Sequence, residues 1–197
     1  MSSGDARGRI LARIKDALDG RATVEHPGAF GGWRPEGSLP SDPVEAFTSL
    51  FEAAGGEVYR FGSEDAAREW LTELAGDFAT VAVGAGVPPA LRPDRPQAPP
   101  DGAALGISWA RCAVAETGSL VLDARDGRRT QLLPPTHLVW VRADDVHASL
   151  TGALVAMKDD LPSGLGLHSG PSKSADLGQI LVRGVHGPGR VVAAILG

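Results

Sequence analysis

Residue types that bind anions or move protons are concentrated near the C-terminal end of the chain. The segment 170–176 reads Gly-Pro-Ser-Lys-Ser-Ala-Asp, and His186 follows it. Its glycine and proline favour a tight turn, and Ser172 or Ser174 is a suitable N-terminal cap for a helix. Lys173 would then stand beside free backbone N–H groups, an arrangement that binds anions. The alternative is that the segment is a loop with a purely structural role and that Lys173 is solvated at the surface. Our candidate site residues in this stretch are Gly170, Ser172, Lys173, Ser174, Asp176 and His186.

A second candidate is an acidic residue in mid-chain. Glu116 and Thr117 interrupt an apolar run at Gly118, between two segments that read as buried strands. An acid in apolar surroundings costs free energy unless it is paired, so Glu116 is a candidate for a carboxylate with a shifted pKa. Equally, its carboxylate could accept backbone N–H groups and fix the turn. We expect this bend, where Thr117 and Gly118 are ligand-binding candidates, and the C-terminal segment to meet at one pocket on the rim of a sheet.

Hydrophobic periodicity predicts the elements that position these residues. Residues 8–19 form an amphipathic helix, and 21–41 are an irregular arm rich in glycine and proline. Asp42 and Pro43 then start a second helix. We divide the chain into an N-terminal helix and arm, residues 1–41, and an α/β domain, residues 42–197.

Within the α/β domain, helices alternate with strands, which implies a parallel sheet with helices packed against it. The strand at 80–83 is followed by Gly84-Ala85-Gly86, a weak nucleotide-binding signal because Pro89 stands where a third glycine would be. The position still matters, since ligands of α/β sheets gather at the carboxyl ends of strands. The later predicted elements are strands at 104–109, 137–141 and 191–196, two strands within 114–122, a hairpin at Asp126-Gly127, a helix from Asp144, and a helix from Ser172 to Leu181.

Composition excludes several classes of function. The net charge of −5 does not favour nucleic-acid binding. No apolar run approaches the roughly 18 residues of a membrane span, and the N-terminal residues lack the apolar core of a signal peptide, so we expect a cytoplasmic protein. With Cys112 as its one cysteine, the chain cannot form an internal disulfide or an all-cysteine iron–sulfur cluster. The five histidines lack metal-binding spacing, so we assign no metal ligands.

Three motifs resemble the LUD domain family. They are Ala115-Glu116-Thr117-Gly118-Ser119-Leu120-Val121-Leu122, then Leu133-Pro134 with His137, and Ser169-Gly170-Pro171-Ser172-Lys173-Ser174-Ala175-Asp176 with Gly184-Val185-His186-Gly187-Pro188. The resemblance covers roughly residues 40–197. It implies a three-layer α/β/α sandwich like that of the glucosamine-phosphate isomerase, ribose-phosphate isomerase and CoA-transferase group. It also implies a role in a bacterial system that oxidises L-lactate to pyruvate together with iron–sulfur partner proteins.

Two functions of different classes follow from this resemblance. In the first, the chain is the cluster-free component of the lactate system, with no cofactor of its own, and its polar pocket binds a small anionic metabolite or stabilises the fold. In the second, it is a free-standing enzyme acting on a phosphorylated or CoA-linked acid. Glu116 would then be general base or nucleophile, Lys173 would hold the anion, and His186 would exchange a proton. A module that binds a carboxylate without turning it over is a third alternative.

Overall fold

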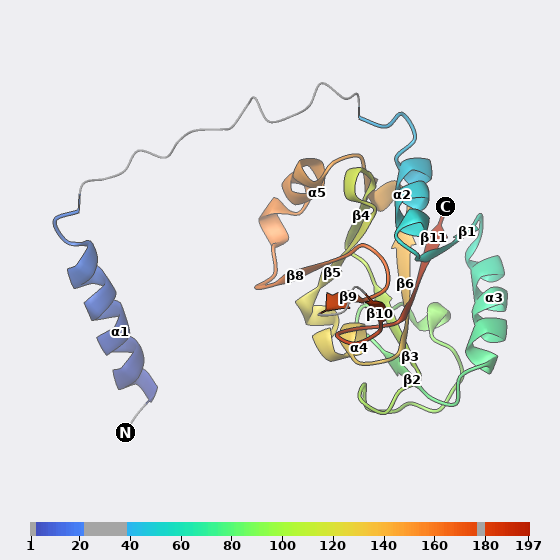
Figure 1. Cartoon of the computed structure of the whole chain (residues 1–197), viewed down its shortest axis with the longest axis horizontal. Coiled ribbons are helices and arrows are strands. Elements are labelled where there is room, and N and C mark those ends of the chain that lie inside the picture. The colour runs from blue at the N-terminus through green and yellow to red at the C-terminus, as the bar shows by residue number, and fades with distance from the viewer. Residues whose placement is uncertain (1–2, 22–38, 177–179) are drawn as a thin grey trace. The chain divides into compact units, whose positions relative to one another are not determined.

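The computed structural model describes residues 3–21, 39–176 and 180–197 (Figure 1). The chain divides into two compact units, residues 1–37 and 38–197. The first contains α1 (Ser3–Leu18), the amphipathic helix that the periodicity predicts, followed by Gly20 with a φ of +78°. Most of the irregular arm expected at 21–41 lies outside the described residues.

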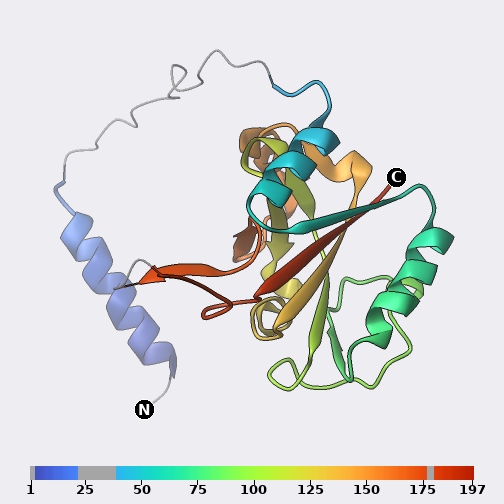
Figure 2. The same cartoon turned by 45° about the vertical axis from the view of Figure 1, so that its right-hand side comes forward.

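The second unit is built on a sheet of five parallel strands (Figure 2). Its spatial order is β1-β11-β6-β3-β2. Successive residues of a strand point to opposite faces of the sheet, and both faces are buried. Val191 and Ala193 of β11 lie in one core cluster and Val192 lies in the other. The strands are β1 (Glu57–Phe61), β2 (Val81–Val83), β3 (Leu105–Trp109), β6 (Thr136–Arg142) and β11 (Arg190–Leu196).

Helices cover both faces of this sheet. On one face, α3 (Glu64–Gly76) and the short 3-10 helix η1 (Pro89–Leu91) bury Leu71 and Leu91 against Trp140 of β6. On the other face, α2 (Pro43–Ala53) buries Phe47 and Phe51, whose rings stack with centroids 5.3 Å apart. The predicted α/β sandwich with a parallel central sheet is therefore confirmed.

A second, smaller sheet shares the α2 face and was not predicted. Its order is β7-β4-β5-β8, with antiparallel pairing except between β4 and β7. Helix α5 (Leu150–Ala156) covers its outer face with Ala153, against Cys112 and Val121. The strands are β4 (Cys112–Val114), β5 (Ser119–Asp123), β7 (Val146–His147) and β8 (Leu165–His168). The short connecting helices are η2 (Ala115–Thr117), η3 (Ala124–Asp126), α4 (Arg128–Leu132), η4 (Ala143–Asp145) and η5 (Lys158–Asp160).

Three local predictions are wrong. The helix expected from Ser172 to Leu181 is instead the antiparallel pair β9 (Lys173–Asp176) and β10 (Ile180–Arg183). The expected hairpin at Asp126-Gly127 is η3 followed by α4, and the helix expected from Asp144 begins only at Leu150, after the cap Ser149. Short apolar runs fit helical and extended periods equally well, so the surrounding contacts decide between them.

No helix in the described part of the chain is long and apolar enough to cross a membrane.

Candidate functional site

Three of the predicted site residues line one small pocket. Gly170, Ser172 and His186 enclose a cavity of about 220 Å³ together with the neighbouring His168 and Ser169. We call it the corner pocket, and its full lining is Leu132, Leu167, His168, Ser169, Gly170, Ser172, His186, Gly187, Pro188 and Val191. Its polar groups are hydroxyls and imidazoles, which can hydrogen-bond to a small carboxylate.

The anion-binding helix terminus expected at this corner is not formed. Because Ser172 precedes a strand, its backbone N–H donates to the Pro188 carbonyl at 2.9 Å, and its own carbonyl accepts from Gly184 N–H at 3.0 Å. Lys173 Nζ donates to the carbonyl of Ala54, the C-terminal cap residue of α2. A cation at the C-terminus of a helix is stabilised by unpaired carbonyls and the helix dipole. Lys173 therefore contacts the opposite type of helix end from the one expected.

Two further predicted residues lie on the β9 strand. Ser174 is half-buried and pairs with Val182 of β10. Asp176 pairs through its backbone with Ile180, while the side chain of Asp176 lies outside the described residues.

In mid-chain, the carboxylate of Glu116 holds the start of a helix. Its Oε1 accepts the backbone N–H of Leu150, the first residue of α5, at 2.6 Å. Glu116 N–H donates to the Ala148 carbonyl at 3.2 Å. These contacts match the turn-fixing alternative for Glu116. Its carboxylate lies at the start of α5, whereas the Lys173 amine lies at the end of α2.

The bend at Gly118 and the C-terminal segment are nevertheless in contact, through the side chains of two serines. Ser119 Oγ lies 2.6 Å from Ser169 Oγ and donates to Thr117 Oγ1 at 2.8 Å. Gly118 has a φ of +56°, and a Cβ there would lie 2.7 Å from Leu50 Cβ on α2. Gly118 is thus required for packing against α2.

A larger cavity, of about 740 Å³, lies at the carboxyl ends of β2 and β3. Ligands of parallel α/β sheets bind at this edge. We call this cavity the rim pocket, and its lining residues are Ala85, Gly86, Trp109, Arg111, Asp123, Arg125, Asp126, Asp145, His147, Ala156 and Met157.

The glycine turn after β2 is shaped around the Asp126 carboxyl at the rim pocket. A Cβ on Gly84 would lie 2.4 Å from Asp126 Oδ2, so residue 84 must lack a side chain. Asp126 Oδ1 accepts Gly86 N–H at 2.5 Å, and Oδ2 accepts Trp109 N–H at 3.2 Å. The turn that resembled a phosphate-binding loop therefore directs an amide at the chain's own carboxylate.

Asp123 and Asp126 lie three residues apart with opposite pKa shifts. Burial raises the pKa of Asp126, against the hydrogen bonds from Gly86, Trp109 and Ser108 that lower it. Burial also raises the pKa of Asp123, but the hydrogen bonds and charge of Arg125 outweigh this effect and lower the pKa overall. Carboxyls whose surroundings drive their pKa values apart are typical of acid–base sites.

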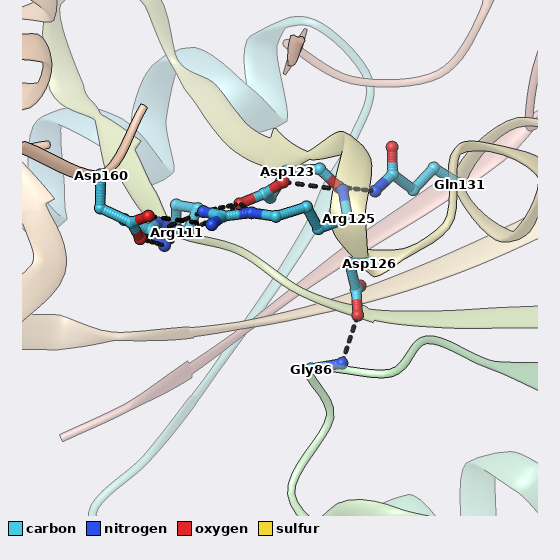
Figure 3. A network of polar contacts seen from close by, with 7 residues as sticks. All are labelled: Gly86, Arg111, Asp123, Arg125, Asp126, Gln131 and Asp160. Atoms are coloured by element: carbon cyan, nitrogen blue, oxygen red, sulfur yellow. Dashed lines mark hydrogen bonds and ion pairs between the residues drawn. The ribbon is translucent and has the colours of Figure 1, made fainter. Parts of the chain in front are cut away.

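Two arginines and two aspartates form a network beside the rim pocket (Figure 3). Arg125 Nε donates to Asp123 Oδ2 at 2.8 Å, while its Nη1 and Nη2 donate to Asp160 at 2.9 and 3.1 Å. Arg111 Nη1 donates to the same Asp160 carboxylate at 2.8 Å. Both guanidinium groups thus share one carboxylate.

A buried hydrogen-bonded chain runs from Asp126 into the space between the two sheets. Ser108 bonds to the Asp126 carboxyl, and Ser108 Oγ lies 2.9 Å from His137 Nε2. Complete burial, with a smaller effect of His168, lowers the pKa of His137 to about 3. His137 is therefore neutral at physiological pH.

Sequence reasoning pointed to Ala85 and Gly86 at the end of the strand at 80–83 but missed the charged residues of the rim pocket. The relevant signal was charge directly after a buried strand, as in Asp123-Ala-Arg125-Asp126 following β5. Gly86 bonds to Asp126 and Asp160 bonds to Arg125, but both lie too far from this segment along the sequence for a spacing rule to connect them.

Comparison with known proteins places the chain in a family. The LUD domain model matches residues 101–196. A protein of Deinococcus radiodurans named lactate utilization protein C is 30% identical over 193 residues, covering 86% of this chain and 91% of the relative. Lactate utilization protein C 1 of Bacillus mycoides is 36% identical over 100 residues, covering 47% of this chain and 43% of the relative.

A solved structure shows the same fold. The crystal structure of a DUF162 family protein from Deinococcus radiodurans superposes with a TM-score of 0.60, covering 79% of this chain and 96% of that one. Its sequence is 21% identical, so this likeness concerns the fold alone. The domain match and the Deinococcus radiodurans relative, which aligns along most of this chain, show that the chain belongs to the LUD domain family.

Proposed function

We propose that this chain is a cytoplasmic component of a bacterial L-lactate utilization system that oxidises L-lactate to pyruvate together with iron–sulfur proteins. The observation that carries the proposal is the similarity to lactate utilization protein C along 86% of the chain. Relatives from several bacteria carry this name.

Within such a system, this chain would be the component without a cluster. Its one cysteine, Cys112, is buried beneath α5, and burial raises the pKa of its thiol to about 11. Cluster ligation requires the thiolate, which the surroundings of Cys112 disfavour. Electron transfer through iron–sulfur clusters would then take place in the partner proteins.

Deletion of the gene in its bacterial host tests this proposal. We expect poor growth on L-lactate as carbon source, normal growth on glucose, and recovery when the gene is restored. The native protein from lactate-grown cells should also co-purify with iron–sulfur proteins. Normal growth of the deletion strain on L-lactate would contradict the proposed role.

The corner pocket is our proposed site for the small anionic metabolite of this system. Its volume of about 220 Å³ suits a three-carbon acid, and Ser172 and His186 offer hydrogen bonds to a carboxylate. Gly170 has a φ of +114° and lies close to Ala54 of α2, so its role is to form the wall of the pocket.

Calorimetric titration with L-lactate and pyruvate examines this site. We expect Ser172→Ala and His186→Gln each to weaken binding several-fold, by about 1 kcal/mol for one lost hydrogen bond. Thr72→Ala, on α3, is the matched control and should bind as the parent does. Equal affinity in all variants would remove the corner pocket from the proposal, and turnover measured on the same samples separates an enzyme from a binding module.

A further inference from the structure

The rim pocket has the size and place of a ligand site. Its volume of about 740 Å³ exceeds what a three-carbon acid fills, and lies within the range of about 300–1,000 Å³ usual for small-molecule sites. Segments that follow β2, β3 and β6 all contribute to its wall, as do residues at the end of β5. Its occupant should therefore be larger than lactate.

One arginine of this pocket retains hydrogen-bond donors. Among the described residues, Arg111 contacts acidic side chains through Nη1, which leaves Nε and Nη2 for another acceptor. The Arg111 side chain is 30% exposed. A guanidinium presents paired N–H groups that match a carboxylate.

A carboxylate of the chain itself already binds to these two arginines. The carboxylate of Asp160 lies between Arg111 and Arg125 and bonds to both. Asp160 is well exposed, with 60% of its side chain accessible. A ligand carboxylate at this position would therefore compete with Asp160 for the two guanidinium groups.

The remaining lining combines an apolar wall with a fixed acceptor. Trp109, Ala156 and Met157 offer apolar and aromatic surface. The Asp126 carboxyl is held by two backbone N–H groups, and among the described residues no cation forms an ion pair with it. The Ser108 hydroxyl also bonds to this carboxyl, so three of its four lone-pair sites are occupied and one is left to accept from a ligand hydroxyl.

We propose that the rim pocket binds an organic carboxylate larger than a three-carbon acid. The carboxylate contacts Arg111, the apolar body lies against Trp109 and Met157, and a hydroxyl group donates to Asp126. This site is separate from the corner pocket, and its test does not depend on a role in lactate metabolism.

Calorimetric titration of the full chain with L-3-phenyllactate tests the recognition of charge and size. We expect measurable binding of this acid. The uncharged 3-phenyllactamide should bind at least about tenfold more weakly because it loses the charged hydrogen bonds to Arg111, and L-lactate should bind at least about tenfold more weakly because it lacks the apolar body. Equal affinity of acid and amide, or no binding of the acid, would overturn the proposal.

Two substitutions should change this affinity in opposite directions. Arg111→Lys keeps the charge but removes the paired donors, so phenyllactate should bind about tenfold more weakly. Asp160→Asn removes the competing carboxylate and should strengthen binding. Arg68→Lys, on the exposed side of α3, is the control. If Asp160→Asn weakens binding as Arg111→Lys does, the network is structural and the carboxylate site is refuted.

The hydroxyl contact has its own measurement. The parent protein should prefer phenyllactate to 3-phenylpropionate, which lacks the hydroxyl, and Asp126→Asn should lose this preference. Thermal unfolding of each variant verifies that it is folded. Should Asp126→Asn not fold, equal affinity of the parent for the two acids would by itself contradict the assigned contact.

Discussion

Asp126 and Gly84 form a pair in which the carboxyl of one residue occupies the space where the other would carry a side chain. A methyl group added at position 84 would place its carbon 2.4 Å from Asp126 Oδ2, well inside van der Waals contact. The carboxyl cannot move freely, because Gly86 and Trp109 hold it through backbone N–H groups.

We therefore expect Gly84→Ala to lower the free energy of unfolding by about 1–3 kcal/mol, the usual cost of overpacking a buried position. Urea unfolding followed by tryptophan fluorescence measures this change. Gly62→Ala is the matched control, since nothing lies within 4 Å of a Cβ there. Equal stability of the two variants would mean that the turn yields easily to a side chain.

Glu116 offers a second test at this scale, because its structural and catalytic interpretations separate cleanly. Its carboxylate accepts the first backbone N–H of α5. Glu116→Ala should lower the free energy of unfolding by about 1 kcal/mol, as loss of a helix cap does. Glu116→Gln keeps an acceptor oxygen, so it should retain stability and growth on L-lactate. A folded Glu116→Gln protein that fails to support that growth would favour the general-base hypothesis.

At the scale of elements, the β9–β10 pair and helix α2 are joined by the Lys173 amine. Lys173 Nζ contacts the Ala54 carbonyl, and both Lys173 and Arg183 lie near Gly55 at the end of the helix. Two cations thus face the negative end of the α2 dipole.

Lys173→Gln should consequently reduce the free energy of unfolding by about 0.3–1 kcal/mol, and by less at high salt. Denaturant titrations at two salt concentrations measure the effect, with Lys158→Gln on η5 as a surface control. Unchanged stability combined with lost metabolite binding would favour Lys173 as the anion-holding residue of the sequence-based hypothesis.

Elements with strong periodicity and well-marked ends could be predicted from the sequence. Helix α2 begins after Asp42, whose side chain accepts Glu45 N–H, and α3 begins after Ser63 in the same way. The final strand β11 carries an unbroken apolar run because both of its faces are buried. By contrast, the β9–β10 pair has weak periodicity, and Ser172 resembles a helix cap although its backbone pairs with Pro188.

The candidate site could be predicted only in part, for a related reason. Gly170, Ser172 and His186 are close in sequence, and a turn brings them to one pocket. The rim pocket depends on contacts such as that between Gly86 and Asp126, forty positions apart. Such a contact follows from strand order, and neither residue type nor local spacing reveals it.

For the molecule as a whole, acid stability depends on a histidine buried between the two sheets. His137 is completely buried, its Nε2 bonds to Ser108, and its Nδ1 has no partner among the described residues. Burial lowers its pKa from 6.5 to about 3, and burial also lowers the pKa of the neighbouring His168. The unfolded chain therefore binds protons in a pH range where the folded chain does not.

Because the unfolded state takes up the proton first, the contribution of His137 to stability is complete above pH 6.5 and is lost as the pH falls toward 3. At pH 5 the loss should be about 2 kcal/mol, since one pKa unit corresponds to about 1.4 kcal/mol. Urea unfolding between pH 7 and 5 measures this slope. His137→Gln keeps a hydrogen bond to Ser108 but does not titrate, so its stability should vary much less with pH, even if it is lower throughout. Parallel pH profiles for the two proteins would show that His137 is not the group that limits acid stability.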